Sequence, residues 1–243
     1  MRTTGVALLL LLAAAAPVTA RAQLTIEPRD ARFWIGGAAL LAASAALDER
    51  LHAEAGAHRS RSLDHVADAV DPLGRARYLL PALAGAVVVP RLAGRRALSD
   101  AALRVAAGYV VADGLGSVVK PLVGRHRPDS SGDAWRFRPL GRGGRWGSFP
   151  SAHTTHAFAI AAGVSREAHR PWVTALCYAT AATVGAQRVY RRAHWASDVV
   201  GGAVLATAAS RTTVSWLERR MPDAARSAQV GLGPGGATVT LSF

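Results

Sequence analysis

Two residues in the last quarter of the chain, His194 and Asp198, have types and spacing that suit nucleophilic catalysis. A helix that begins near His194 would place both side chains on one face, because they stand four residues apart. A carboxylate there accepts a hydrogen bond from the imidazole Nδ1–H and leaves Nε2 unprotonated as a nucleophile. A surface pair or a core histidine with satisfied hydrogen bonds fits the same spacing, so this pair needs further support.

A second histidine, His153, suits the role of proton donor. It follows Pro150 and Ser151, which indicate a helix start with Ser151 at the N-cap. Free N–H groups at a helix N-terminus favour an anion, and an imidazole beside them can protonate a departing alkoxide. A simple capped helix is the plain alternative.

Three basic residues could gather around a phosphoryl group and balance its charge: Lys120, Arg127 and Arg188. Any one of them is equally compatible with a solvated basic loop. We expect the remaining arginines near these segments to be of the solvated kind or to guide anions inward; they are Arg125, Arg136, Arg138, Arg142, Arg145, Arg191 and Arg192.

Taken together, these residues form the ordered pattern K-x6-R-P, P-S-x-H and R-x5-H-x3-D. The set resembles the signature of the type 2 phosphatidic acid phosphatase superfamily over residues 101–215. That superfamily includes bacterial lipid phosphatases, non-specific acid phosphatases and vanadium haloperoxidases. The resemblance implies that His194 attacks phosphorus, Asp198 orients it and His153 is the general acid. It also implies phosphate binding by Lys120, Arg127, Ser151, Ala152 (through its N–H) and Arg188.

Two positions depart from the family pattern. Ala152 stands where the family usually has Gly, and Gln187 stands where it usually has Ser before the arginine of the third motif. The extra methyl group leaves the N–H of Ala152 available, and Gln187 still offers a hydrogen-bond donor. These two departures therefore bear on substrate preference and rate more than on the type of reaction.

The implied function is hydrolysis of phosphate monoesters or pyrophosphates, of lipids in the first instance, through a phosphohistidine and without a metal or other cofactor. Three alternatives stay open: a broad-specificity periplasmic acid phosphatase, a haloperoxidase that would need vanadate, and a non-catalytic membrane protein. The expected partners are a phosphorylated lipid or small phosphoester and a membrane, with no nucleic acid. Oligomeric state is left open.

Composition agrees with an anionic substrate without requiring one. The formal net charge is +13, and Lys120 is the only lysine, so arginine carries nearly all the positive charge. Arginine presents a planar fork to phosphate oxygens, although a GC-rich genome would produce the same bias. The single cysteine, Cys177, excludes a disulfide within the chain.

Apolar runs separated by Gly, Pro and charged residues predict an all-α bundle of about six helices. Their expected ranges are 33–47, 78–92, 101–119, 151–164, 172–187 and 196–217, with an amphipathic helix around 63–70. Residues 121–150 should form a long Arg- and Gly-rich active-site loop. Alternation in the tail predicts a short C-terminal β-hairpin. We divide the chain into a signal peptide (1–22), N-terminal helices (23–100), a catalytic core (101–220) and the hairpin tail (226–243).

The first 22 residues have the pattern of an export signal: Arg2, an apolar run, Pro17 and small residues before Gln23. An uncleaved membrane anchor is the alternative. The helices suit thin membrane spans or a soluble periplasmic bundle, and periodicity does not separate the two. We expect an exported, membrane-associated enzyme of a bacterial envelope whose active site faces the periplasm.

Overall fold

The computed structural model describes residues 27–129, 132–141 and 143–221, and the backbone of strands 228–233 and 236–241. Eight α-helices lie in these segments: α2 (Ala31–Ala46), α3 (Asp48–Ala57), α4 (Arg61–Val70), α5 (Ala76–Leu92), α6 (Arg96–Val123), α7 (Ala152–Ala168), α8 (Pro171–Tyr190) and α9 (Ala196–Arg220). Two 3₁₀ turns, η1 (Asp71–Gly74) and η2 (Gly144–Trp146), join them. The strands β1 (Ala228–Gly233) and β2 (Gly236–Leu241) pair antiparallel, with Val230 opposite Val239.

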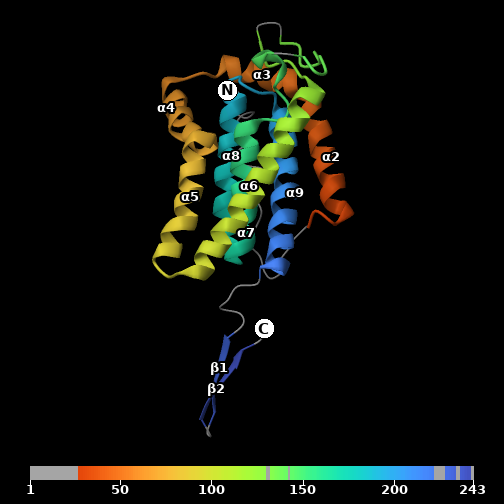
Figure 1. The fold of residues 1–243 in the computed structure, drawn as a ribbon. Helices are drawn as coiled ribbons and strands as arrows, with labels where there is room; N and C mark the ends of the chain where they lie inside the picture. The colour runs from red at the N-terminus through yellow and green to blue at the C-terminus, as the bar shows by residue number, and fades with distance from the viewer. Residues whose placement is uncertain (1–26, 130–131, 142, 222–227, 234–235, 242–243) are drawn as a thin grey trace.

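The all-α bundle expected from the sequence is confirmed. All six long helices run along the bundle, and the short helices α3 and α4 lie together at one end (Figure 1). The sequence did not indicate α3, which lies between the expected helices at 33–47 and 63–70. The expected signal segment, residues 1–22, lies outside the described residues.

Helices α6, α7 and α9 approach closely because small residues meet where they cross. A Cβ on Gly108 of α6 would lie 2.6 Å from Ser210 Oγ of α9, and one on Gly163 of α7 would lie 3.3 Å from the same atom. Ser210 is fully buried, and its hydroxyl donates to the carbonyl of Ala159 at 2.7 Å. The alanine-rich core around Tyr109 continues this packing through Ala112, Ala159, Ala206 and Ala209.

The long connection between α6 and α7 is folded on itself. It begins at Gly124, which takes the left-handed conformation (φ 56°) that ends α6. A Cβ at this position would lie 1.9 Å from the carbonyl oxygen of Arg138, so glycine is required. Backbone hydrogen bonds from His126 to Arg136 and from Arg127 to Arg145 then hold the connection together.

The chain direction brings the three sequence motifs to one end of the bundle. The C-terminal ends of α6 and α8 and the N-terminal ends of α7 and α9 all lie there, beside α3 and α4 (Figure 1). The start of α2 lies at the opposite end.

Candidate active site

His194 lies in the turn between α8 and α9, and its neighbours determine which ring nitrogen carries the proton. Nδ1 is 2.8 Å from the carbonyl oxygen of Ser148. A carbonyl oxygen only accepts hydrogen bonds, so Nδ1 must be the protonated nitrogen. Nε2 is 3.2 Å from Nη1 of Arg127, which only donates. Nε2 therefore presents a lone pair, as a nucleophile requires.

Burial lowers the pKa of His194, and the charges of Arg127 and Lys120 add to this effect. The nearby carboxylate of Asp198 works in the opposite direction but does not overcome this effect. The imidazole is therefore neutral at pH 7, the state in which Nε2 can attack an electrophile.

Asp198, fully buried in the first turn of α9, acts on His194 in a different way from the direct hydrogen bond that the spacing predicts. Its Oδ2 is 3.5 Å from Nδ1, farther than the carbonyl of Ser148. The same oxygen accepts from Ser148 Oγ at 2.5 Å and from the N–H of Trp195 at 2.9 Å. Asp198 thus holds the segment that carries the carbonyl and also places a negative charge behind the imidazole.

Arg127 and Lys120 reach the site from the long loop and the last turns of α6. Arg127 donates from Nη1 to the carbonyl of Ala193 at 2.9 Å, which fixes its guanidinium over the His194 ring edge. Lys120 Nζ donates to the carbonyls of Gly147 and Pro150 at 3.1 and 2.7 Å. Both cations are therefore held by carbonyl oxygens of the chain that surrounds His194 and leads into α7.

The start of α7 supplies backbone donors. Ser151 is the N-cap as expected, but its hydroxyl accepts from Thr154 Oγ1 at 3.0 Å and makes no capping bond to the backbone. Its own N–H donates to the carbonyl of Asp198 at 3.0 Å, which joins the second motif to the third. The N–H groups of Ala152 and His153 occupy the first turn, where a helix offers no internal acceptor.

His153 faces a carboxylate that sequence reasoning did not assign to the site. Asp71 Oδ1, on η1, lies 3.6 Å from His153 Nε2 and 3.1 Å from Arg188 Nη2. Burial would raise the pKa of Asp71, yet its hydrogen bond with Arg75 and the charge of Arg188 outweigh burial and hold that pKa below its usual value. Asp71 is thus a fixed negative charge beside the expected general acid and the third basic residue. Its only sequence signal is the Asp-Pro step that ends the amphipathic segment.

Arg125 corrects one expectation. The sequence groups it with the solvated or anion-guiding arginines, but it is 3% exposed. Its guanidinium binds Asp198 Oδ1 at 2.9 Å, Asp48 Oδ2 at 2.8 Å and the carbonyl of Ala134 at 2.8 Å. Asp48 also accepts from the N–H of Ser197 at 2.9 Å. A buried ion network therefore joins α3, the long loop and α9 directly behind the carboxylate that serves His194.

Two charged residues of α6 have partners on α7. Asp113 contacts His156 Nε2 at 2.8 Å. Arg104 forms a two-pronged bond with Glu167. His156 is buried and packs against Tyr109. Within residues 27–221, leaving out 130–131 and 142, no group of three or more His, Cys, Asp or Glu side chains is arranged to hold a metal ion.

The structure thus brings the motif residues to one place. Electrostatic interactions connect His194 with Lys120 and Arg127, His153 with Arg188 and His194, and Arg188 with Arg127. Two imidazoles, three cations and a helix N-terminus surround a single region that is suited to an anion with several oxygens.

The profile of the PAP2 superfamily matches residues 101–222. The chain belongs to the PAP2 superfamily. Its fold is similar to that of the transmembrane PAP2 type phosphatidylglycerolphosphate phosphatase from Bacillus subtilis, with a TM-score of 0.63 and 23% identity over 80% of this chain and 97% of that one. It is also similar to LpxE from Aquifex aeolicus, with a TM-score of 0.51 and 22% identity over 70% of this chain and 95% of that one.

Among curated relatives, the lipid A 1-phosphatase of Porphyromonas gingivalis is 39% identical over 72 residues. That match includes 29% of this chain and 16% of the relative's length. It therefore supports the PAP2 assignment of the shared segment and leaves most of that larger protein unmatched.

Proposed function

We propose that the chain is a PAP2 phosphatase that hydrolyses phosphate monoesters or pyrophosphates of lipids through a phosphohistidine. The observation that carries this proposal is the environment of His194. Its Nδ1 proton is held by the carbonyl of Ser148, and its Nε2 lone pair lies beside the guanidinium of Arg127. At His194 Nε2, a nucleophilic lone pair thus lies next to a cation that can bind phosphoryl oxygens.

In the first step, Nε2 of His194 attacks phosphorus, the N–P bond forms and the P–O bond to the leaving group breaks. Lys120, Arg127 and Arg188 balance the charge on the phosphoryl oxygens, together with the N–H groups at the start of α7. His153 gives its proton to the departing oxygen. In the second step a water oxygen attacks phosphorus and the deprotonated His153 takes up a proton from that water. The N–P bond breaks, which releases inorganic phosphate and restores both histidines.

Asp71 extends this scheme beyond the family motifs. Burial and the charge of Arg188 lower the pKa of His153 to about 4, and the negative charge of Asp71, 3.6 Å from Nε2, opposes them only in part. The negative charge of a bound phosphate would add to that of Asp71 and favour the protonated ring that a general acid needs. The same carboxylate orients Arg188. We assign Asp71 a positioning role, because both of its effects pass through other side chains.

The test is a phosphate-release panel with purified protein, in which the wild type is compared with His194→Ala. Lipid monoesters, soluble esters and pyrophosphates are all included, with and without EDTA. The wild type should release phosphate with EDTA present and, after rapid acid-free quenching, carry a base-stable, acid-labile phosphoryl label. Equal release by the two proteins would remove His194 as nucleophile. Bromide oxidation that depends on added vanadate would favour the haloperoxidase alternative.

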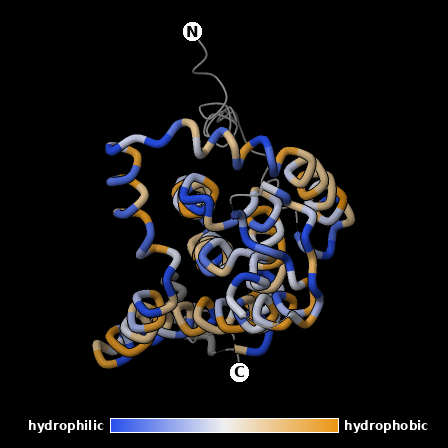
Figure 2. Tube along the Cα trace, turned by 90° about the horizontal axis from the view of Figure 1, so that it is seen from above, coloured by the Kyte–Doolittle hydropathy of each residue, from blue (hydrophilic) through white to orange (hydrophobic). Residues whose placement is uncertain are grey.

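We further propose that the protein is membrane-associated and that its substrate is a lipid. The support is the apolar outer surface of the long helices, which a soluble monomer rarely exposes on this scale. The exposed side chains include Ile35, Leu40, Leu80, Val88, Val89, Val110, Val118, Leu122 and Leu176. Figure 2 shows hydrophobic residues recurring along the helices at the periphery of the bundle. By length and composition, α6 is the one helix among the described residues that suffices to cross a bilayer, and α2 is a shorter apolar helix.

A further inference from the structure

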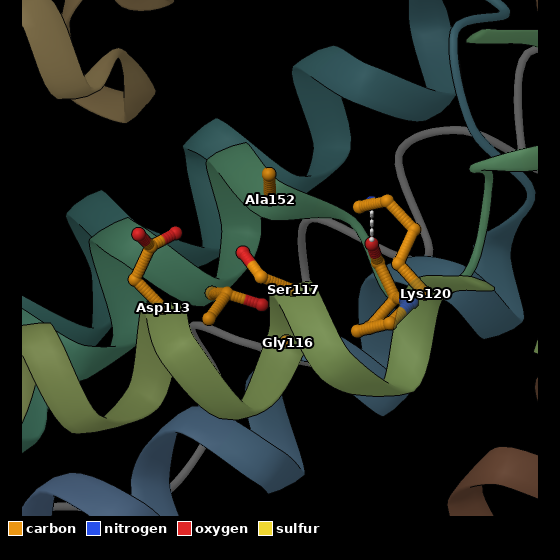
Figure 3. Close-up of a pocket in the computed structure, with 7 residues that line it drawn as sticks. Asp113, Gly116, Ser117, Lys120 and Ala152 are labelled. Carbon is orange, nitrogen blue, oxygen red and sulfur yellow. Dashed lines mark hydrogen bonds between the residues drawn. The ribbon is translucent and has the colours of Figure 1, made fainter. Parts of the chain in front are cut away.

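A small polar recess lies between α6 and the start of α7, next to the proposed phosphate site (Figure 3). Its lining includes Asp113, Ser117 and Lys120 from α6, and Ala152 and Thr155 from the start of α7. The space that a group the size of a water molecule can occupy measures only about 10 Å³. The recess therefore has room for a single hydroxyl group of a bound molecule but not for a whole lipid.

The recess is continuous with the site because two residues belong to both. Lys120 and Ala152 are expected to bind phosphate oxygens, and both line the recess. Asp113 lies seven residues before Lys120 on the same helix, about 10 Å along its axis. A group in the recess would thus belong to the same substrate as the phosphate, a few bonds away from it.

The recess combines an acceptor, the carboxylate of Asp113, with groups that can donate, namely Lys120 and the hydroxyls of Ser117 and Thr155. His156 Nδ1 is 2.8 Å from the carbonyl of Gly74, so Nδ1 carries a proton, and Nε2 is 2.8 Å from Asp113 Oδ1. Whichever partner holds the proton between them, Asp113 still offers acceptor lone pairs, and its side chain is 45% exposed. The buried Thr155 adds a hydroxyl, 1% exposed, whose Oγ1 has no hydrogen-bond partner among the described residues.

We propose that this recess binds a hydroxyl group of the leaving alcohol, so that the enzyme prefers phosphate monoesters of polyhydroxylated lipid headgroups to lipid diphosphates. This inference rests on the proposed function and narrows its substrate class. A hydroxyl donates to Asp113 and accepts from Thr155. A second phosphate has only acceptor oxygens when ionised, so it would face the carboxylate without a shared proton. A site built to bond a hydroxyl also disfavours an alcohol that lacks one.

The experiment measures kcat/KM of the full chain in detergent micelles with three lipids. They are a monoester with a free hydroxyl next to the phosphate, a monoester whose neighbouring hydroxyls are all acylated, and a polyprenyl diphosphate. We expect the wild type to favour the first lipid over each of the others by about tenfold or more, the ratio that corresponds to one well-formed hydrogen bond. Similar kcat/KM values for the three lipids would overturn the proposal.

The variant Asp113→Asn keeps an acceptor for His156 and adds a donor to the recess. It should raise the ratio of kcat/KM for the polyprenyl diphosphate to kcat/KM for the hydroxyl ester about tenfold. Asp100→Asn is the matched control, because Asp100 lies on the same helix far from the site and pairs with Arg91 on the surface; it should leave the ratio unchanged. An unchanged ratio in a folded Asp113→Asn protein would contradict the proposed hydroxyl site. It would not contradict the proposed phosphatase activity.

A second variant covers the case in which Asp113→Asn does not fold. Thr155→Val has the same shape and removes only the unpartnered hydroxyl. It should reduce kcat/KM several-fold for the hydroxyl ester while leaving the acylated ester unaffected, and equal losses on both would contradict the assignment. If the wild type releases no phosphate from any of the three lipids or from a soluble aryl phosphate, the proposed function itself fails.

Discussion

At the scale of single residues, the site depends on groups that fix the state of His194 and do not themselves react. The carbonyl of Ser148 determines the tautomer, and Asp198 holds the Ser148 segment. Arg125 and Asp48 hold Asp198 in turn. The resemblance of the three motifs to the PAP2 pattern predicts which residues share the site, and the contact of Arg127 with His194 agrees with that prediction. It did not predict Asp48, Asp71 or the buried position of Arg125, since their roles come from contacts between distant segments.

The first prediction concerns pH. Because burial holds the pKa of His194 below its ordinary value of 6.5, the ring stays neutral as pH falls through 6.5 and protonates only at lower pH. The acid limb of kcat/KM should therefore lie below pH 6.5, as measured with a soluble ester between pH 4 and 8. An acid limb centred above pH 6.5 would contradict the buried, neutral state of this histidine.

The second prediction concerns the buried ion network. Arg125→Ala leaves Asp48 and Asp198 buried without their cation, so it should lower the free energy of unfolding by about 3–5 kcal/mol and abolish most activity. Chemical denaturation in detergent measures the first effect. Arg138→Ala, in the same loop but exposed, is the control and should change stability by less than about 0.5 kcal/mol. Comparable losses in the two variants would argue against a special role for Arg125.

At the scale of elements, the short segments α3 and η1 at the end of the bundle position residues of the site, as the long helices do. The apolar runs and their Pro and Gly boundaries predicted the six long helices, and the structure confirms them. No comparable pattern marks α3 and η1, because both are short and polar and are held by tertiary contacts. η1 contacts the first turns of α7: its Gly74 carbonyl accepts from His156, and its Asp71 faces His153.

The third prediction tests this contact. A Cβ on Gly74 would lie 2.8 Å from both Cβ and Cδ2 of His153, so Gly74→Ala must displace the expected general acid. We expect kcat to fall at least about tenfold, which corresponds to about 1.4 kcal/mol of transition-state stabilisation. The loss should be greatest for poor leaving groups, which need the proton most.

Gly85→Ala is the matched control for that substitution. Gly85 lies inside α5, and no atom lies within 4 Å of the place that an alanine Cβ would occupy. Alanine should therefore leave kcat unchanged and stabilise the helix by about 0.5–1 kcal/mol. A Gly74→Ala enzyme as active as Gly85→Ala would show that η1 does not position His153.

At the scale of the whole molecule, the six long helices place the start of α2 and the active site at opposite ends. If all six cross the bilayer, an active site facing the periplasm requires α2 to begin on the cytoplasmic side. A cleaved export signal at residues 1–22 would place that start outside and the site inside. A cleaved signal and a periplasmic site, the two sequence-based expectations, are therefore compatible if one of these helices does not span or if the whole bundle lies in the periplasm.

The fourth prediction decides between these arrangements. In a Cys177→Ser background, Trp135→Cys marks the exposed active-site loop and Arg95→Cys marks the α5–α6 turn at the other end. For a periplasmic site, a membrane-impermeant maleimide added to intact bacteria whose outer membrane is permeabilised should label the first and spare the second. The reverse pattern would place the active site in the cytoplasm.

The ion network of Asp48, Arg125 and Asp198 has a consequence for how the molecule folds. It joins positions 150 residues apart in sequence, as the packing of Gly37 of α2 against Val204 of α9 also joins distant segments. Individual helices can form from local contacts, but the nucleophile acquires its final geometry only after these distant segments come together. Recovery of activity after denaturation should consequently lag behind recovery of helix content, as stopped assays alongside circular dichroism would record.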